Sequence, residues 1–577
     1  MATTLGYDPD GNTVAETAQT MDSAHPGQVQ VATHAATYDA GDRQATETDN
    51  GLTTVYGYDA QGQQRVATVQ DGQTAIATAL DAEGRVTRIG EGAGNAGPYV
   101  SSFTYNANDL LQAFTLPGGV QESVQYDPNS QVVGVTALGP NTNGLFTYLT
   151  SQYKYTYDAA NRVNSTKTLS GTDSLSYDRA SRLSSETEQP GSTQVIAKGG
   201  AYGWTYDANG NLQTAIDDTG ATDLYTYSTT ICDELTQMGA TGNPVTETNA
   251  YGYAGRGDVT SIANTAQPTD KNVLVQHLGY DSQGRVNQVT YLDHANGNTT
   301  TTITIGYNAD GQRSDYTFTP QGQPTLDTQF QYRDGQLAEQ RVVSDTTANG
   351  PVVIYTNTYL YGPQGEPLEL LHAQPGQTVA RYWYILDGQG SVVALTDANG
   401  SVVDRYAYDS WGESTSDDRT NEHVPQQLRS KAQYYDEKLT WYWMPDNRYY
   451  DPETERYLQP EGDPSFVYAS DSPANLGVAC KIEVRFKTDV NFTIPVVNKR
   501  VVKYHAYIIT QGAQTRYYRS GPQNHTLSDS SGNSSNGAGA FGYVRTDHGI
   551  TSVEAPSCRR VCSMGGKFYA SSCGRRS

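Results

Sequence analysis

The stretch 156-TYDAANRVNS-165 decides the fold, because the same pattern returns at 176-SYDRASRLSS-185. Tyrosine is a strand-forming residue, and the aspartate after it favours a turn because its carboxylate accepts hydrogen bonds from backbone N–H groups two residues on. Asn161, three residues after Asp158, stands where a positive φ is easiest for glycine or asparagine. The alternating run that follows predicts the next strand, so each copy is predicted to be a β-hairpin.

Further copies of this pattern recur along most of the chain. They read 6-GYDPDGNTV-14, 56-YGYDAQGQQRVATV-69, 204-WTYDANGNLQTA-215, 279-GYDSQGRVNQVTY-291 and 306-GYNADGQRSDYTF-318, with weaker copies at 104–114, 125–135, 251–262 and 331–340. Some neighbouring copies are about twenty residues apart, as the spacing of Tyr157 and Tyr177 illustrates. Because one hairpin cannot bury its own face, we expect the copies to stack into one continuous sheet.

The repeated D-x-x-G is also part of the pattern of a calcium-binding loop. Each copy, however, offers too few acidic ligands for the six to eight oxygens that Ca²⁺ takes. The pattern therefore favours a turn over a calcium-binding loop. Neither a metal nor another cofactor is expected.

The composition agrees with a β-rich, turn-rich protein. The 577 residues include 43 tyrosines against 10 phenylalanines, and 57 glycines and 24 prolines. The glycines keep no three-residue period, which excludes a collagen-like chain.

Charge divides the chain into two parts. Residues 480–577 carry 14 Lys and Arg against 5 Asp and Glu, a net charge of +9. The preceding residues carry a net charge of −33, and the two parts sum to the −24 of the whole chain. Four of the five cysteines also lie in the basic part. Such asymmetry favours a large acidic body followed by a small domain with a different role.

No apolar run approaches the ~18 residues that span a bilayer, so no transmembrane segment is expected. The opening MATTLGYDPDGNTVAETAQT lacks the basic and apolar regions of a secretory signal. A secreted or cell-surface location by a non-classical route, or the absence of an upstream segment, is the corresponding expectation.

The tyrosine–aspartate copies from about residue 6 to residue 465 resemble the YD repeat of the RHS family, which teneurins and insecticidal toxin-complex subunits share. The resemblance implies a mainly β fold, in which YD-repeat hairpins form a β-sheet shell that spirals round a hollow. The repeat region is short for such a shell, so an incomplete shell or a fragment of a longer protein is an open alternative.

Residues 379–465, which include 379-VARYWYILDGQGSVVALTDANGSVVDRYAYDSWGE-413 and 447-NRYYDPETERYLQPEG-462, resemble the RHS repeat-associated core. In that family the core plugs one end of the shell, and the variable polypeptide after it is commonly a toxic domain. The implied organisation is a repeat region at 1–378, the core at 379–465, a linker or degenerate cleavage region at 466–480 and a variable effector domain at 481–577.

Many relatives cut themselves after the core by an aspartyl-protease-like arrangement. The corresponding candidates here are Asp451 and Asp463, with Arg448 holding the pair, because two close carboxylates that share a proton suit amide cleavage. The chain departs from the family at Glu455, where a glycine is usual, and at the cleavage stretch 471-DSPANLGVAC-480. The alternative, which we favour, is that Asp451 caps a turn and Asp463 is a solvated loop residue.

The basic part contains alternating runs, such as KIEVRF and HAYIIT, that predict a small β or α+β domain. It resembles a domain found behind many RHS cores and, weakly, the circularly permuted papain-like hydrolases. That resemblance implies His505 as the base and Cys558 or Cys562 as the nucleophile, since an imidazole next to a cysteine favours the thiolate. The alternative is that His505 is not catalytic and packs as an ordinary residue of a strand.

Three other interpretations of the basic part stay open. Cys558, Cys562 and Cys573 with His548 would be a zinc site of uncommon spacing, or the cysteines would form disulfides in an exported protein. A nuclease would use the basic residues for phosphate contacts and His505, His525 and His548 for acid–base chemistry.

The sequence therefore predicts an RHS-type polymorphic toxin or delivery protein used in intercellular competition. Its expected partners are its own encapsulated C-terminal domain, a cognate immunity protein, secretion machinery and a target-cell surface. The alternative is a surface YD-repeat protein that binds carbohydrate or another cell through exposed tyrosines and is not an enzyme.

Overall fold

The computed structural model describes residues 2–21, 29–49, 52–58, 64–69, 74–91, 99–140, 148–190, 200–217, 219–228, 234–241, 248–255, 257–264, 274–293, 299–308, 311–333, 335–346, 350–414 and 424–459, and nine short strands between residues 482 and 570. The chain divides into two compact units, formed mainly by Met1–Gln459 and by Ala474–Ser577. Each unit is described by itself below.

The first unit is built almost entirely of β-strands. The strands of its first half are β1 (Ala2–Tyr7), β2 (Thr13–Met21), β3 (Val29–Tyr38), β4 (Gln44–Asp49), β5 (Leu52–Tyr58), β6 (Gln64–Val69), β7 (Thr74–Leu80), β8 (Val86–Glu91), β9 (Val100–Tyr105), β10 (Leu111–Thr115), β11 (Gln121–Tyr126), β12 (Val132–Gly139), β13 (Tyr148–Tyr157), β14 (Val163–Lys167), β15 (Gly171–Tyr177), β16 (Leu183–Pro190), β17 (Gly200–Tyr206) and β18 (Leu212–Ile216).

The strands of its second half are β19 (Thr222–Tyr227), β20 (Leu235–Thr241), β21 (Thr248–Tyr253), β22 (Val259–Asn264), β23 (Leu274–Tyr280), β24 (Val286–Asp293), β25 (Thr299–Tyr307), β26 (Arg313–Pro320), β27 (Thr325–Arg333), β28 (Gln336–Thr346), β29 (Gly350–Tyr361), β30 (Pro367–Ala373), β31 (Ala380–Leu386), β32 (Val392–Thr396), β33 (Val402–Arg405), β34 (Tyr434–Asp436), β35 (Trp441–Trp443), β36 (Tyr449–Asp451) and β37 (Arg456–Tyr457). Two 3₁₀ turns, η2 (Pro117–Gly119) and η4 (Ser430–Ala432), complete the unit.

Strands β1 to β33 form one 33-stranded sheet. Every strand pairs antiparallel with the next along the chain, as β13, β14, β15 and β16 illustrate. Among the described residues, β1 pairs with β2 alone and β33 with β32 alone, so the sheet does not close on itself. The predicted stacking of hairpins into a continuous sheet is confirmed.

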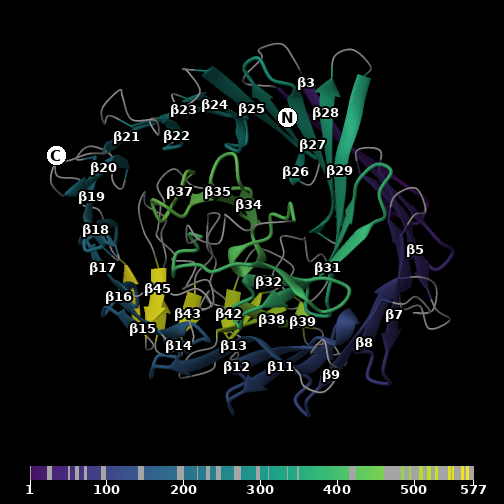
Figure 1. The fold of residues 1–577 in the computed structure, drawn as a ribbon, viewed down its shortest axis with the longest axis horizontal. Helices are drawn as coiled ribbons and strands as arrows, with labels where there is room; N and C mark the ends of the chain where they lie inside the picture. The colour runs from purple at the N-terminus through teal and green to yellow at the C-terminus, as the bar shows by residue number, and fades with distance from the viewer. Residues whose placement is uncertain are drawn as a thin grey trace. The chain divides into compact units, whose positions relative to one another are not determined.

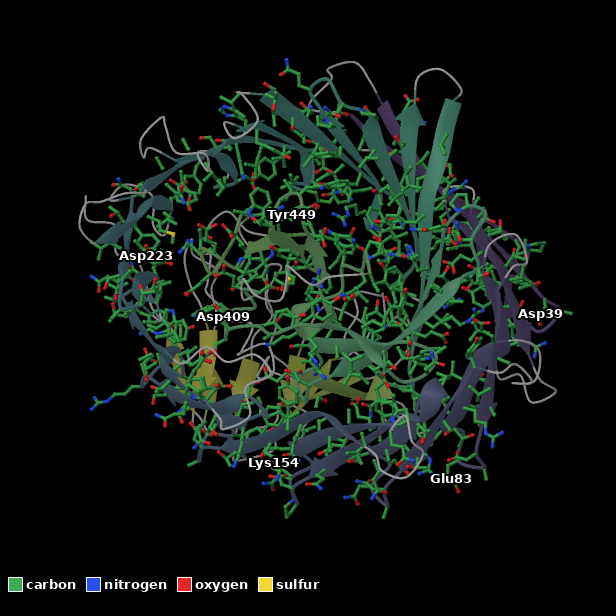
Figure 2. The ribbon with its side chains drawn as sticks, in the orientation of Figure 1. Asp39, Glu83, Lys154, Asp223, Asp409 and Tyr449 are labelled. Carbon is green, nitrogen blue, oxygen red and sulfur yellow. The ribbon has the colours of Figure 1, made fainter. Side chains whose placement is uncertain are left out.

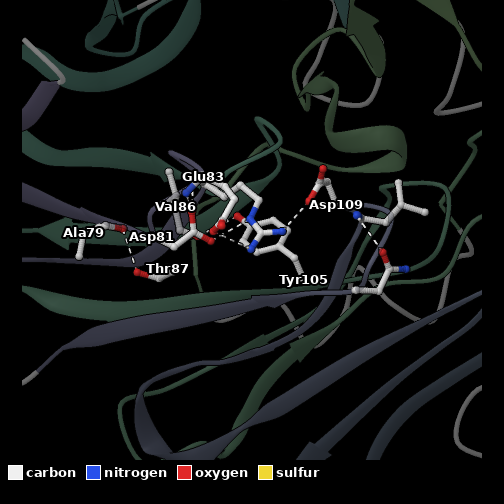
Figure 3. Close-up of polar contacts among 10 residues, drawn as sticks. Ala79, Asp81, Glu83, Val86, Thr87, Tyr105 and Asp109 are labelled. Carbon is white, nitrogen blue, oxygen red and sulfur yellow. Dashed lines mark hydrogen bonds and ion pairs between the residues drawn. The ribbon is translucent and has the colours of Figure 1, made fainter.

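The tyrosine–aspartate copies form the turns of these hairpins, as predicted. The turn of Figure 3 has the same form, although Leu80 replaces the tyrosine. Its Asp81 carboxylate accepts the backbone N–H of Glu83 at 3.1 Å and of Arg85 at 2.9 Å, and the Arg85 Nε donates to its second oxygen at 2.8 Å. Gly84 has φ +83°, and non-glycine residues hold the same conformation in other copies, such as Asn161 at +63° and Ser181 at +68°. The turn is thus a three-residue loop that ends in a left-handed residue, and a bulge follows in the return strand, where the register shifts opposite Ala79 and Leu80.

In most copies the tyrosine also joins its hairpin to the preceding one. The Tyr177 hydroxyl donates to the carbonyl oxygen of Val163 at 2.6 Å, while the Arg162 guanidinium lies over the Tyr177 ring at 4.3 Å. We call the first contact the inter-repeat hydrogen bond. Thirteen tyrosines make it in the described part of the chain: Tyr38, Tyr58, Tyr105, Tyr126, Tyr157, Tyr177, Tyr206, Tyr227, Tyr253, Tyr280, Tyr307, Tyr361 and Tyr408.

The sheet follows a curved path, and its last strands run along the inner side of the curve (Figure 1). Strands β31 and β32 are buried on both faces. Trp383 and Ile385 pack with Phe103, Phe114 and other residues of β7–β12, whereas Tyr384 and Leu386 pack with residues of β22–β28. Since successive side chains of a strand point to opposite faces, β31 fills the space between two distant parts of the sheet.

Residues 424–459, which we call the terminal segment, form a small four-stranded sheet of β34–β37. Its aromatic residues Trp441, Trp443 and Tyr449 join the same core cluster as Val286, Ile303 and other residues of the large sheet. The terminal segment therefore packs against the inner face of the large sheet, and this contact positions the candidate site.

In the second unit, the described residues form β38 (Ile482–Phe486), β39 (Thr493–Ile494), β40 (Ala506–Thr510), β41 (Arg516–Ser520), β42 (Leu527–Asp529), β43 (Val544–Thr546), β44 (Gly549–Thr551), β45 (Val561–Met564) and β46 (Lys567–Ala570). Strands β38–β42 form one antiparallel sheet, and β43–β44 and β45–β46 form two hairpins. The runs KIEVRF and HAYIIT thus contain strands, as predicted. Across the described residues of both units, we find no helix with the length and apolar character of a membrane span.

Candidate functional site: the contacts of the terminal segment

A fully buried arginine joins the terminal segment to β26. Arg313 Nη1 lies 3.2 Å from Asp436 Oδ2 and donates to the Tyr449 hydroxyl at 3.1 Å. Its guanidinium lies over aromatic rings on several sides, at 4.4 Å from Phe330, 4.3 Å from Tyr434 and 5.0 Å from Trp443. The faces of these rings carry partial negative charge, so they offset part of the cost of burying the cation.

Asp436 completes this cluster. It accepts the Tyr316 hydroxyl at 3.0 Å through its other oxygen. Burial raises the pKa of Asp436, and the neighbouring Arg313 opposes that shift. The pair therefore couples β26 to β34 by charge, hydrogen bonds and ring packing together.

A second contact joins the terminal segment to β17. The Trp204 indole N–H donates to Glu455 Oε1 at 2.8 Å, and the Trp204 ring lies 5.9 Å from the Trp411 ring. Glu455 has φ +58°, a conformation that costs a residue with a Cβ about 1–2 kcal/mol. This backbone conformation explains why a glycine would fit at this position. The chain instead has Glu455, whose carboxylate accepts the Trp204 hydrogen bond.

Glu455 belongs to a set of buried carboxyl groups on the inner face. Burial raises the pKa of Glu455 well above its ordinary value, and Asp409 and Asp223 raise it further, whereas the Trp204 hydrogen bond opposes the shift. Figure 2 labels Asp223 on the sheet and Asp409 on the inner side of the curve. Burial also raises the pKa of Glu186 and of Glu369 to about 8. Burial thus favours the neutral form of Glu455, Glu186 and Glu369.

Further contacts join the end of the sheet to its beginning. Arg381 forms a bidentate ion pair with Glu91, with Nε–Oε1 at 2.9 Å and Nη2–Oε2 at 2.7 Å. The Gly388 backbone N–H donates to the Tyr155 hydroxyl at 2.8 Å. At Gly118, φ is +78° and an added Cβ would lie 2.3 Å from the backbone nitrogen of Gly400. Residues 380–400 thus contact β8, β13 and the turn after β10.

The residues proposed for self-cleavage are placed only in part. Asp451 is buried, accepts the Glu453 backbone N–H at 3.1 Å and the Thr454 hydroxyl at 2.9 Å, and has a pKa that burial raises to about 8. The Arg448 guanidinium pairs with Asp446 and lies 3.9 Å from the Tyr457 ring centre. Asp463 lies outside the described residues, so its pairing with Asp451 stays a prediction. The geometry of Asp451 is that of a turn cap.

The predicted effector residues are not brought together in the described part. His505, Cys558, His525, His548 and Cys573 lie outside the described residues, and Cys562 is placed only as a backbone position on β45. Among the described residues, no group of His, Cys, Asp and Glu side chains has the arrangement of a metal site.

Sequence reasoning missed both long-range contacts of the terminal segment. Arg313 stands five residues after Asn308, the position that holds Val163 or Leu183 in other copies, so a charged residue in an apolar register was an available signal. The contact of Glu455 with Trp204 spans 251 residues and leaves no local pattern.

Comparison with known proteins agrees with this architecture. Residues 193–471 match the family model described as the teneurin YD-shell. Residues 193–471 of the chain thus resemble a teneurin YD shell. The match includes the repeats from β17 onward and the terminal segment, so Arg313, Trp204 and Glu455 all lie in the matched region.

The chain is also similar to longer curated proteins. It is 24% identical over 350 residues to the tRNA3(Ser)-specific nuclease WapA of Bacillus spizizenii, and equally to the tRNA nuclease WapA of Bacillus subtilis strain 168. These matches cover 51% of this chain but only 14% of each relative. The chain thus spans about a seventh of the length of these relatives.

A solved structure shares the fold. The crystal structure of TcdB2-TccC3-Cdc42 matches with a TM-score of 0.51 at 15% identity, over 82% of this chain and 23% of that one. The expected mainly β fold, with its hairpins in one long open sheet, is therefore confirmed.

Proposed function

We propose that this chain is an RHS-type toxin delivery protein, whose YD shell encloses or presents residues 481–577 as an effector. The observation that carries the proposal is the packing of residues 380–414 and 424–459 on the inner face of a YD-repeat sheet, in a chain whose residues 480–577 carry the opposite net charge. The WapA relatives are named tRNA nucleases, which supports an effector activity, and the shared fold supports a shell. Secretion, a cognate immunity protein and use in intercellular competition are parts of the same proposal.

The direct test is expression of residues 480–577 in a bacterial cytoplasm, with the full chain as the matched control. We expect the isolated segment to arrest growth and the full chain to be tolerated. Soluble expression of the segment without arrest would count against an effector.

Substitutions within that segment separate the two proposed chemistries. A papain-like hydrolase requires a base and a thiolate, so His505→Ala and either Cys558→Ala or Cys562→Ala should both relieve the arrest. A nuclease should lose toxicity with a histidine substitution but keep it without the cysteines, and the purified segment should degrade RNA or DNA. Cys573→Ala is the control for a general loss of folding.

Self-cleavage by Asp451 and Asp463, with Arg448 as the positioning residue, is a separate proposal. If it occurs, the purified full chain should yield two fragments that separate under denaturing conditions, and Asp451→Asn should yield one intact chain. An intact wild-type chain would leave Asp451 as the turn cap described above.

A further inference from the structure

The register of the large sheet places four carboxyl groups on one face of β15–β19. Opposite residues of an antiparallel pair point to the same face, and so do residues two apart in a strand. By this rule, the carboxyl side chains that share the face of Trp204 are Asp173, Glu186, Glu188 and Asp223. Glu186 on β16 and Asp223 on β19 are three strands apart, which is at least about 14 Å at the usual spacing of strands.

Two turns that pack on this face bring three more carboxyl groups. Glu455 accepts the Trp204 indole N–H, and the Trp411 ring lies 5.9 Å from the Trp204 ring. Trp411 belongs to the turn that Asp409 caps, because Asp409 accepts the backbone N–H groups of Trp411 and Glu413 at 2.9 and 2.8 Å. We call the seven groups the carboxyl row: Asp173, Glu186, Glu188, Asp223, Asp409, Glu413 and Glu455.

The centre of the carboxyl row has no basic partner in the part of the chain that the structure describes. There, hydrogen bonds but no ion pairs are found for Glu186, Asp409 and Glu455. Glu186 is 5% exposed and Glu455 is 7% exposed, and each has one oxygen that is buried without a hydrogen-bond partner among the described residues. The arginines nearest in sequence, Arg182 and Arg456, contact an aspartate of their own hairpin and a tyrosine hydroxyl instead. Ionised carboxylates here would therefore need a cation from outside the row.

The rest of the row is accessible and lies beside aromatic rings. Asp223 and Asp409, both labelled in Figure 2, are half-buried, and Glu413 is exposed. The Trp204 ring is stacked on the Tyr202 ring at 6.2 Å, and aromatic faces attract ammonium groups. Among the described residues, no three of these carboxyl groups converge as the ligands of a metal ion do. A spread over three strands thus suits several cationic groups in line rather than one compact ion.

We propose that the carboxyl row binds a linear aliphatic polyamine, a flexible chain that carries ammonium groups at intervals. Its ammonium groups pair with Glu186, Glu455 and Asp223, and its methylene segments lie against the Trp204 ring. An unbranched chain can reach two carboxylates that are more than nine-tenths buried, which a folded basic domain cannot do. The assignment is independent of any activity of residues 481–577.

Polyamine binding at this site releases protons. Burial raises the pKa of Glu186 to about 8 and the pKa of Asp409 to about 7, so part of the row is protonated at neutral pH. Ammonium groups favour the ionised carboxylates and lower both pKa values, so protons leave the row as the polyamine binds. The affinity should therefore rise as pH rises through this range.

Isothermal titration calorimetry of the full chain with spermidine tests the site. Spermidine, a linear trivalent polyamine, should bind saturably, and its binding heat should differ between buffers of different ionisation enthalpy because protons are released. Hexaamminecobalt(III) carries the same charge in a compact form and should bind several-fold more weakly. This comparison separates a fit to the row from general attraction to an acidic chain.

Matched variants locate the binding. The double variant Glu186→Gln, Glu455→Gln keeps the side-chain shapes but loses two charges, so spermidine affinity should fall at least about tenfold, the factor for a hydrogen bond between charged groups. Asp223→Asn, at a half-buried position, should also weaken binding, and the exposed Asp10→Asn is the control that should leave it unchanged. The absence of saturable binding, equal affinities of the wild-type chain and these row variants, or equal affinities for spermidine and the cobalt complex would overturn the proposal.

Discussion

The indole nitrogen of Trp204 lies 2.8 Å from the Glu455 carboxylate, although the two residues are separated by 251 positions. Trp204 is on β17 of the large sheet and Glu455 is in the turn between β36 and β37 of the terminal segment. The second oxygen of Glu455 is buried without a hydrogen-bond partner among the described residues. An ionised carboxylate in this position would have no hydrogen bond to its second oxygen, so burial favours the neutral acid.

We therefore predict that the first unit becomes less stable as pH rises from about 5 to 8. The pKa of Glu455 is raised well above its ordinary value by burial, and the pKa values of Glu186, Glu369 and Asp451 are raised to about 8. Each folded-state pKa lies above the unfolded one, so the folded state holds protons that the unfolded state has already lost, and stability falls with pH in this window. Urea unfolding monitored by tryptophan fluorescence at several pH values measures the slope.

Glu455→Gln tests the contribution of this one residue. Glutamine still accepts the Trp204 hydrogen bond but does not ionise. The difference in unfolding free energy between pH 5 and pH 8 should therefore shrink by at least about 1 kcal/mol, which is less than the free energy that a shift of one pKa unit contributes. The exposed Asp10, replaced by asparagine, is the control and should leave the slope unchanged. An unaltered slope in the Glu455→Gln chain would mean that Glu455 is ionised in the folded state.

Arg313 provides a prediction about charge burial. Arg313→Met leaves Asp436 buried without its cation, and removing one partner of a buried pair typically costs 3–5 kcal/mol. We expect that loss at neutral pH in urea unfolding, with faster hydrogen exchange in β34. The double variant Arg313→Met, Asp436→Asn removes both charges. It should therefore recover part of the unfolding free energy that the single variant loses. If the double variant were less stable than the single one, ring packing rather than charge compensation would dominate.

The local structure of the large sheet was predictable because the residues that specify it are adjacent in the sequence. Asp158 forms its turn with groups two and four residues on, and the register of β13 with β14 follows from that turn. Tyrosine at the strand end and a left-handed residue three after the aspartate are likewise local features.

The contacts of the terminal segment were not predictable in the same way. Trp204 with Glu455, and Arg313 with Asp436, join residues more than 120 positions apart, and their partners depend on the path of the whole sheet. The burial of β31 on both faces could be suspected from the apolar run in 383-WYIL-386, but not which distant strands cover each face. The proposed effector residues stay predictions, because neither local pattern nor described geometry brings them together.

The inter-repeat hydrogen bond predicts the effect of a single hydroxyl. Tyr177→Phe removes the donor to Val163 and leaves that carbonyl without its partner, so the junction of β14 and β15 should lose about 1 kcal/mol. A sheet of this length need not unfold in one step, so hydrogen exchange of the β14 and β15 amides is the suitable measurement. Tyr7→Phe is the matched control in the unmodified chain and should change exchange little. Equal effects at both sites would show that the tyrosine hydroxyl contributes nothing at the junction.

Gly118 tests the close approach between the turn after β10 and the end of β32. Gly118→Ala places a Cβ 2.3 Å from the backbone nitrogen of Gly400 and 2.7 Å from the carbonyl carbon of Asn399, so backbone rather than a flexible side chain must move. Gly11→Ala is the matched control, because Gly11 has a similarly positive φ of +93° but no atom within 4 Å of the added Cβ. Both variants bear the left-handed strain of about 1–2 kcal/mol, and only Gly118→Ala bears the clash as well.

We expect urea unfolding to show a larger loss of unfolding free energy for Gly118→Ala, by about 1–3 kcal/mol, with faster hydrogen exchange in β32. Equal losses in the two variants would mean that residues 397–400 are not held against this turn in solution.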